Sequence, residues 1–233
     1  MYRHLRLPGI LLSAFLLTVP LLNGQSLEEI ERSTVEVDNI LERARASDSD
    51  TEKERLATQT LNMARSLRYD GGIIRSSIVL GEVSARTGKT EQALQYYLEA
   101  EAKVISTGNK VAQLSVQTAL GDLFLKEKLY ANARRYYHEV LVLQPNDYRI
   151  KEKIADACLL DMRFDSAEFF YKELIVKYKE EGNNARLVQI YQKLANAYDQ
   201  NGDAGKSLYY YLPIEDLVER FGTSQERGLL YNN

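Results

Sequence analysis

Small and aromatic residues recur along this chain at distances longer than the period of one helix. An apolar residue followed by a small one occurs four times, and the small member is Gly81, Gly121, Ala155 or Ala195. Twelve positions later comes a second small residue, four positions after that a tyrosine, and three positions after that Ala or an aliphatic residue. The four sets are Ala93, Tyr97 and Ala100; Ala133, Tyr137 and Val140; Ala167, Tyr171 and Leu174; and Ser207, Tyr211 and Ile214. Four matches at fixed spacing indicate a structural repeat.

Each copy predicts two helices joined by a tight turn. The small residues allow the two helices to approach closely, and the tyrosine lies on the same helix face because residues i and i+4 are neighbours there. One such hairpin cannot bury its apolar face alone, whereas stacked copies form a superhelix with a continuous core. We therefore expect Gly121→Leu to be severely destabilising and Glu82→Gln to be nearly neutral for stability.

The copies are spaced by 40, 34 and 40 residues, and the shortest spacing is the basic unit. The two longer spacings add six residues around 106–110 and 180–184. Both stretches contain Gly-Asn, which suits the end of one helix and the start of the next. In the shorter link, Pro145 ends the preceding helix.

The repeat register divides the chain into four parts. Residues 25–70 read as a degenerate N-terminal hairpin, with helices over 27–45 and 51–67, and residues 71–222 hold the four copies. The next small residue would fall at position 235, so 223–233 is predicted to begin a further, truncated repeat. We expect about ten helices in an open right-handed solenoid, with fraying after about Thr223 and self-association through the exposed end.

The pattern resembles the tetratricopeptide repeat, whose copies carry a Leu-Gly/Ala pair followed by Gly, Ala, Tyr or Phe, Ala and Pro at set offsets. The likeness covers residues 74–214, although the tryptophan usual in the first helix is absent. It implies an all-α superhelical solenoid of antiparallel helix pairs, with a concave groove that binds peptides or protein segments. It implies no catalysis.

The N-terminal segment has the composition of a signal peptide. Arg3 and Arg6 precede an apolar run at 10–22, which is too short for a comfortable membrane span. Cleavage after Gly24 would leave residues 1–24 as the signal peptide and move the net charge from −3 to −5. An uncleaved signal anchor is the alternative. The sequence therefore predicts an exported protein, periplasmic or associated with the envelope, and its negative charge argues against a nucleic-acid partner.

Few side chains could carry chemistry. After cleavage one histidine, His138, and one cysteine, Cys158, would be left, so a multi-histidine metal site and an internal disulfide are excluded. The Gly-Lys-Thr at 88–90 lacks the earlier glycine of a phosphate loop, because Val83 stands there. We predict no enzyme activity, no cofactor and no metal. His138 is expected to be partly exposed and Cys158 to be buried.

Three tyrosine doublets could suggest stacking platforms for a ligand. They are Tyr96-Tyr97, Tyr136-Tyr137 and Tyr210-Tyr211. The second member of each doublet falls on the packing position of the repeat, so we expect it in the core and expect the first member to be partly exposed.

The resemblance implies that the first helix of each copy lines the groove. One row of candidate groove residues follows the small residues: Glu82, Asp122, Asp156 and Asn196. A second row contains Arg75, Arg149, Lys153 and Lys193. The first row favours a ligand with basic or amide groups. A solvated face of mixed charge is the alternative. The carboxylate clamp of chaperone-binding members is absent, since the matching positions include Ile78, Glu82 and Ala119.

Two function classes remain. The first is a non-catalytic scaffold that binds protein or peptide segments. The second is the periplasmic sensing region of a longer membrane signalling protein, because exported arrays of this kind resemble the N-terminal parts of certain sensor histidine kinases and nucleotide cyclases.

Overall fold

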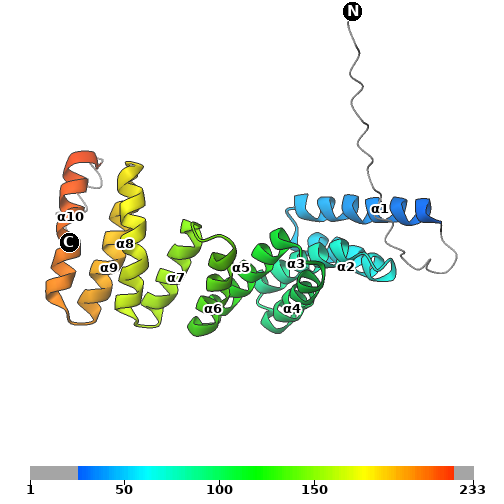
Figure 1. Ribbon diagram of the computed structural model, residues 1–233, viewed down its shortest axis with the longest axis horizontal. Helices are drawn as coiled ribbons and strands as arrows, with labels where there is room; N and C mark the ends of the chain where they lie inside the picture. Colours follow the sequence, from blue (N-terminus) through cyan, green and yellow to red (C-terminus); the bar gives the residue numbers. More distant parts are fainter. Residues whose placement is uncertain (1–25, 223–233) are drawn as a thin grey trace, which may run out of the picture.

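The computed structural model describes residues 26–222, and within that range it contains ten α-helices and no strand. The helices follow one another along an extended array (Figure 1). Their bounds are α1 Leu27–Ala46, α2 Asp50–Ser66, α3 Asp70–Arg86, α4 Thr90–Thr107, α5 Lys110–Lys126, α6 Tyr130–Leu143, α7 Tyr148–Leu160, α8 Phe164–Glu180, α9 Asn184–Gln200 and α10 Ala204–Phe221. The predicted signal peptide at 1–24 and the predicted truncated repeat at 223–233 lie outside the described residues.

Links of two to four residues join consecutive helices, so each helix runs antiparallel to the one before it. Extensive packing joins each helix to its neighbours in sequence, and beyond these pairs the main contacts are α1 with α3 and α3 with α5. Each hairpin thus packs only against the next, which is the organisation of a solenoid. The predicted all-α, tetratricopeptide-like solenoid of antiparallel helix pairs is confirmed. No helix in the described range is long and apolar enough to cross a membrane.

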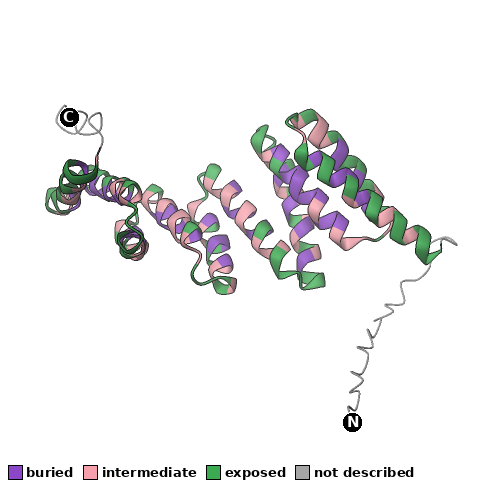
Figure 2. Ribbon diagram, turned by 90° about the horizontal axis from the view of Figure 1, so that it is seen from above, coloured by how far each residue is buried: buried purple, intermediate pink, exposed green. Residues whose placement is uncertain are grey.

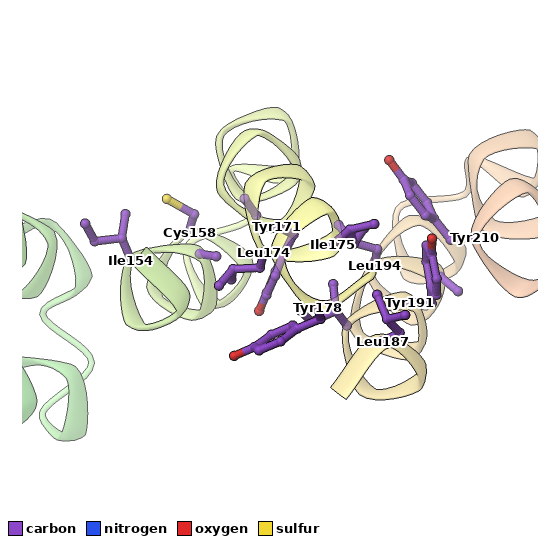
Figure 3. Packing of buried hydrophobic residues seen from close by; sticks show 14 of the residues in the cluster. Ile154, Cys158, Tyr171, Leu174, Ile175, Tyr178, Leu187, Tyr191, Leu194 and Tyr210 are labelled. Carbon is purple, nitrogen blue, oxygen red and sulfur yellow. The ribbon is translucent and has the colours of Figure 1, made fainter. Parts of the chain in front are cut away.

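The core lies where neighbouring helices meet along the array (Figure 2). Figure 3 shows part of it, in which Ile154 and Cys158 of α7, Tyr171 of α8 and Leu194 of α9 belong to one cluster. Of these residues, Cys158 is 2% exposed, as expected from its apolar position. The small residues act as the repeat predicts. A Cβ atom added to Gly81 would lie 2.4 Å from the ring of Tyr97.

The turn within each of the four repeat copies contains a residue in the left-handed backbone region. Gly88 and Gly202 occupy this position in the first and last copies, with φ of 79° and 78°. Lys128 and Met162 occupy it in the two middle copies, with φ of 60° and 55°. Side chains with a Cβ are strained in this region, so the middle turns carry a cost that the outer turns avoid.

Replacing Met162 with glycine is expected to stabilise the protein by about 0.5–1 kcal/mol, because the relieved backbone strain outweighs the added freedom of the unfolded chain. The Met162 side chain is 71% exposed, so little packing is lost. Thermal melts followed by circular dichroism would show a higher Tm. Gly88→Ala is the matched control and should lower Tm, and a fall in Tm for Met162→Gly would contradict the strain argument.

The tyrosine doublets depart from the prediction at the C-terminal copy. Tyr97 and Tyr137 are buried as expected, but Tyr211 is 42% exposed whereas Tyr210 is buried. No described helix follows α10 to cover Tyr211. Tyr210 instead stacks on Tyr198, with ring centroids 5.9 Å apart, and its hydroxyl donates to Glu168.

The middle doublet also departs from the prediction, because Tyr136 is buried as well as its neighbour. Its ring stacks on Phe124 of α5 at 5.5 Å. Only Tyr96 is partly exposed, as expected for a first member, and the next residue after the middle doublet, His138, is exposed.

Candidate binding groove

An open cavity is lined mainly by α3 and α5, and also by Tyr97 of α4, Val140 of α6, the link between α6 and α7, and Arg149 of α7. It has a volume of about 680 Å³ and is called the groove below. Its lining residues are Glu82, Ala85, Arg86, Tyr97, Val111, Leu114, Ser115, Thr118, Ala119, Asp122, Leu123, Lys126, Val140, Gln144, Asp147 and Arg149. A second cavity of about 370 Å³, called the side pocket, adjoins it and shares Glu82, Arg86 and Ser115. The side pocket is completed by Arg45, Lys53, Ile78, Val79 and Val83.

Two aspartates of the first predicted row accept a hydrogen bond from a tyrosine of their own hairpin. In each case the donor is the tyrosine fifteen positions after the aspartate: Tyr137 donates to Asp122 at 2.6 Å, and Tyr171 donates to Asp156. Burial and the bonded aspartate both raise the pKa of each of these tyrosines, so the hydroxyls stay protonated and act as donors.

The last copy keeps the same arrangement with an amide in place of the carboxylate. Tyr211 donates to Asn196 at 2.5 Å, again fifteen positions apart. The bond is exposed, because no described helix covers Tyr211.

Each of these two aspartates also forms an ion pair with a lysine of the following hairpin. Lys153 of α7 pairs with Asp122 of α5, and Lys193 of α9 pairs with Asp156 of α7 at 2.6 Å. Two members of each predicted row are therefore joined in ion pairs between successive first helices. The charges of Asp122 and Asp156 are compensated within the protein, which leaves them less available to a ligand.

The N-terminal hairpin repeats this arrangement with different residues. Arg75 of α3 pairs with Asp38 of α1, and the hydroxyl of Tyr69 donates to the same carboxylate at 3.1 Å. Arg75 thus links α1 to α3. It lines neither of the two cavities.

Glu82 is the exception in the first row. Ala119 stands at the repeat position where the later copies have Lys153 and Lys193. The side chain of Glu82 therefore makes no hydrogen bond or ion pair within the described chain. Its side chain is exposed, but the protein at the junction of the two cavities removes part of its hydration. This desolvation raises the pKa of Glu82, and the nearby charges of Arg45, Arg86 and Lys53 oppose the shift.

Of the eight predicted groove residues, three line the groove: Glu82, Asp122 and Arg149. Arg149 is exposed and lies 3.4 Å from Asp147, the residue that caps α7. The other five residues lie outside both cavities: Asp156, Asn196, Arg75, Lys153 and Lys193.

Four cations that line the two cavities were not predicted. Arg86 and Lys126 occupy the same repeat position, five residues after the small glycine, so the register could have identified them. Lys126 donates to the carbonyl oxygen of Ala85 at 2.5 Å. Arg45 and Lys53 come from the degenerate hairpin, where the sequence offers no register to transfer.

Replacing Glu82 with glutamine is expected to leave Tm nearly unchanged at neutral pH, with at most a slight rise. The folded state raises the pKa of Glu82, so its carboxylate costs stability above the folded pKa, and this cost disappears as pH falls below the unfolded value. Solvent access keeps the effect small. Melts of both proteins between pH 4 and pH 8 would check this, and a large loss of stability in Glu82→Gln would show that the carboxylate has a structural partner.

No family model and no curated protein matches this chain. Solved structures do match in fold. MamA from AMB-1 superposes with a TM-score of 0.61 at 19% identity, over 86% of this chain and 98% of that one. MamA from MSR-1 gives 0.59 at 18% identity, over 81% and 98%. BtubC from P. vanneervenii gives 0.61 at 18% identity, over 82% and 91%. Likeness at this identity concerns the fold, and it supports the tetratricopeptide-like helical repeat.

Proposed function

We propose that this protein is a non-catalytic scaffold that binds protein or peptide segments in the groove. The observation that carries the proposal is the open cavity of about 680 Å³ that α3 and α5 line for most of its length. Its size falls within the range of ligand sites in proteins. Val111, Leu114 and Leu123 give it an apolar wall beside polar groups, which suits side chains of an extended segment.

Two of the three carboxylates of the groove are engaged within the protein, and the third, Glu82, has no free second carboxylate beside it to form an acid–base pair, which favours binding over catalysis. General acid–base catalysis needs a group that is free to exchange protons with a substrate. Asp122 is instead engaged by Tyr137 and Lys153. Asp147 is engaged as the cap of α7.

The proposal is tested by obstructing the groove. Ser115 is exposed and lines both cavities, so Ser115→Tyr should fill the space while leaving the fold intact. An array of random peptides probed with the wild-type protein should give bound sequences that Ser115→Tyr no longer retains. Ser106→Tyr is the matched control, because Ser106 is also exposed, also donates to a backbone carbonyl, and lies outside the cavities.

Loss of binding in Ser115→Tyr alone would support the groove as the binding site. Equal retention by Ser115→Tyr, Ser106→Tyr and the wild type, or no binding by any of them, would contradict the proposal.

The alternative function, a sensing region of a longer signalling protein, uses the same groove as its input site. Its support is the N-terminal segment, in which Arg3 and Arg6 precede the apolar run at 10–22, together with the repeat resemblance. We propose export to the periplasm or envelope on the same basis. N-terminal sequencing of the mature protein tests export. An apolar stretch of about twenty residues encoded after Asn233 would favour the sensing function over the stand-alone scaffold.

A further inference from the structure

The charge around the groove differs from that of the whole chain. The net charge of the protein is −3. The two cavities together are lined by five cationic residues, Arg45, Lys53, Arg86, Lys126 and Arg149, and by three carboxylates, Glu82, Asp122 and Asp147. The binding surface is therefore locally positive on a negative protein.

Ion pairing inside the protein reduces this contrast without removing it, because Arg149 is matched by Asp147 and two further cations are matched by carboxylates outside the lining. Asp122 is already matched by Lys153, which lies outside the cavity lining. Arg45 and Arg86 pair with Glu42 and Asp50, at 3.1 and 2.6 Å. These pairs orient the two guanidinium groups but leave donors on each for a ligand, because a guanidinium has five N–H groups.

Two lysines are not matched by any carboxylate. The side chain of Lys53 makes no hydrogen bond or ion pair within the described chain, and the one described partner of the Lys126 ammonium is a neutral carbonyl oxygen. Of the three carboxylates that line the two cavities, Glu82 alone has no partner within the described chain. A ligand carboxylate would therefore gain more Coulomb energy here than a ligand cation would.

An apolar wall adjoins the cationic side pocket. Val111 of α5 is 76% exposed and lines the groove with Leu114, one helical turn away on the same face. Ser115 lies between this wall and the side pocket, because it lines both cavities. The surface thus presents cations and apolar side chains next to each other.

We propose that the groove and side pocket together bind an acidic peptide segment that also carries apolar side chains. This inference rests on the proposed function. Carboxylates of the segment bind at Lys53, Arg45 and Arg86, and its apolar side chains pack against Val111 and Leu114. Glu82 accepts backbone N–H groups of the segment, which a peptide offers and a nucleic acid does not. A basic segment would find only Glu82 to pair with and would face the surrounding cations.

The experiment compares three fluorescein-labelled twelve-residue peptides with the full-length protein by fluorescence anisotropy. The peptides share the same leucine and serine positions and carry glutamate, glutamine or lysine at the remaining ones. We expect the glutamate peptide to bind about tenfold or more tightly than the lysine peptide, with a preference that weakens as salt is raised. A fluorescein-labelled oligothymidine of similar charge is included as a competing class of ligand.

Single substitutions test whether the peptide binds at the groove and the side pocket. Lys53→Gln should weaken the glutamate peptide about three- to tenfold, because an unpaired lysine near the ligand is lost without breaking an internal contact. Glu82→Gln keeps an oxygen that can accept from the peptide backbone and removes the repulsion toward the peptide carboxylates, so it should tighten binding of the glutamate peptide. Lys179→Gln is the matched control, since Lys179 is exposed on α8, lies outside both cavities and makes no side-chain hydrogen bond or ion pair in the described chain.

Three results would overturn the inference. They are tighter binding of the lysine peptide, equal affinities for Lys53→Gln and Lys179→Gln, or tighter binding of the oligothymidine through Lys53. If none of the three peptides binds but the array yields sequences lost in Ser115→Tyr, the acidic-segment inference fails and the proposed function stands. If the array yields no such sequences, the proposed function fails as well.

Discussion

Replacing Gly121 with leucine is expected to destabilise the protein by about 3 kcal/mol or more, because it overpacks a closed helix crossing. A Cβ atom at this position would lie 2.4 Å from Cε1 and 2.6 Å from Cδ1 of Tyr137. The Tyr137 ring cannot move aside, since it is fully buried and its hydroxyl is held by Asp122. Thermal melts followed by circular dichroism should show Tm lowered by roughly 6–12 °C, the shift expected for a chain of this length.

Gly205→Leu is the matched control for this prediction. Gly205 also lies in a helix, α10, but the nearest atom to an added Cβ is Asp203 Oδ1 at 3.6 Å. The added side chain would project into solvent, so Tm should change little or rise slightly. Equal falls in Tm for the two variants would mean that the contact between Gly121 and Tyr137 does not set the approach of α5 to α6.

Replacing Tyr171 with alanine is expected to cost about 3–5 kcal/mol, the range for removing a large buried aromatic side chain. Tyr171 is fully buried between hairpins, its hydroxyl donates to Asp156, and the ammonium of Lys193 lies 5.7 Å from its ring centroid. Tyr171→Phe should cost only about 1 kcal/mol, because the ring stays and Asp156 keeps its lysine. Denaturant unfolding of both variants would separate the contribution of the ring to the free energy of unfolding from that of the hydroxyl.

Tyr211→Ala is the control at the same repeat position. Its hydroxyl contact to Asn196 matches that of Tyr171 to Asp156, but its side chain is 42% exposed. We expect a loss below about 1 kcal/mol, since surface substitutions rarely cost more. A loss as large as that of Tyr171→Ala would show that Tyr211 is covered in solution.

The candidate site was predicted in part. The register placed Glu82, Asp122 and Arg149 on one surface, and the structure has all three on the groove. It could not show that Lys153 would pair with Asp122, because that contact depends on the rotation between hairpins. The missing lysine at Ala119, which leaves Glu82 unpaired, could have been read from the sequence.

These pairings change the expected ligand. A row of carboxylates suggested a basic or amide-bearing partner. Once the lysines compensate two of those carboxylates, the remaining charge around the groove is positive. The ligand charge that the site prefers thus depends on ion pairs between residues that are 31 or 37 positions apart in the sequence. No local sequence pattern specifies such pairs.

The sequence by itself determined the repeat unit, the helical hairpins and the contact of small residue with tyrosine. These features follow from short-range geometry, since helix period and turn length fix which side chains share a face. Only the tertiary structure decided that Lys128 and Met162 take left-handed turns, that Tyr211 is exposed while Tyr210 is buried, and that Arg45 and Lys53 join α3 around Glu82. The turns depend on how the two helices of one hairpin pack, and the other two features depend on how one hairpin lies against the next. In each case packing between residues distant in sequence overrides the preference of a single position.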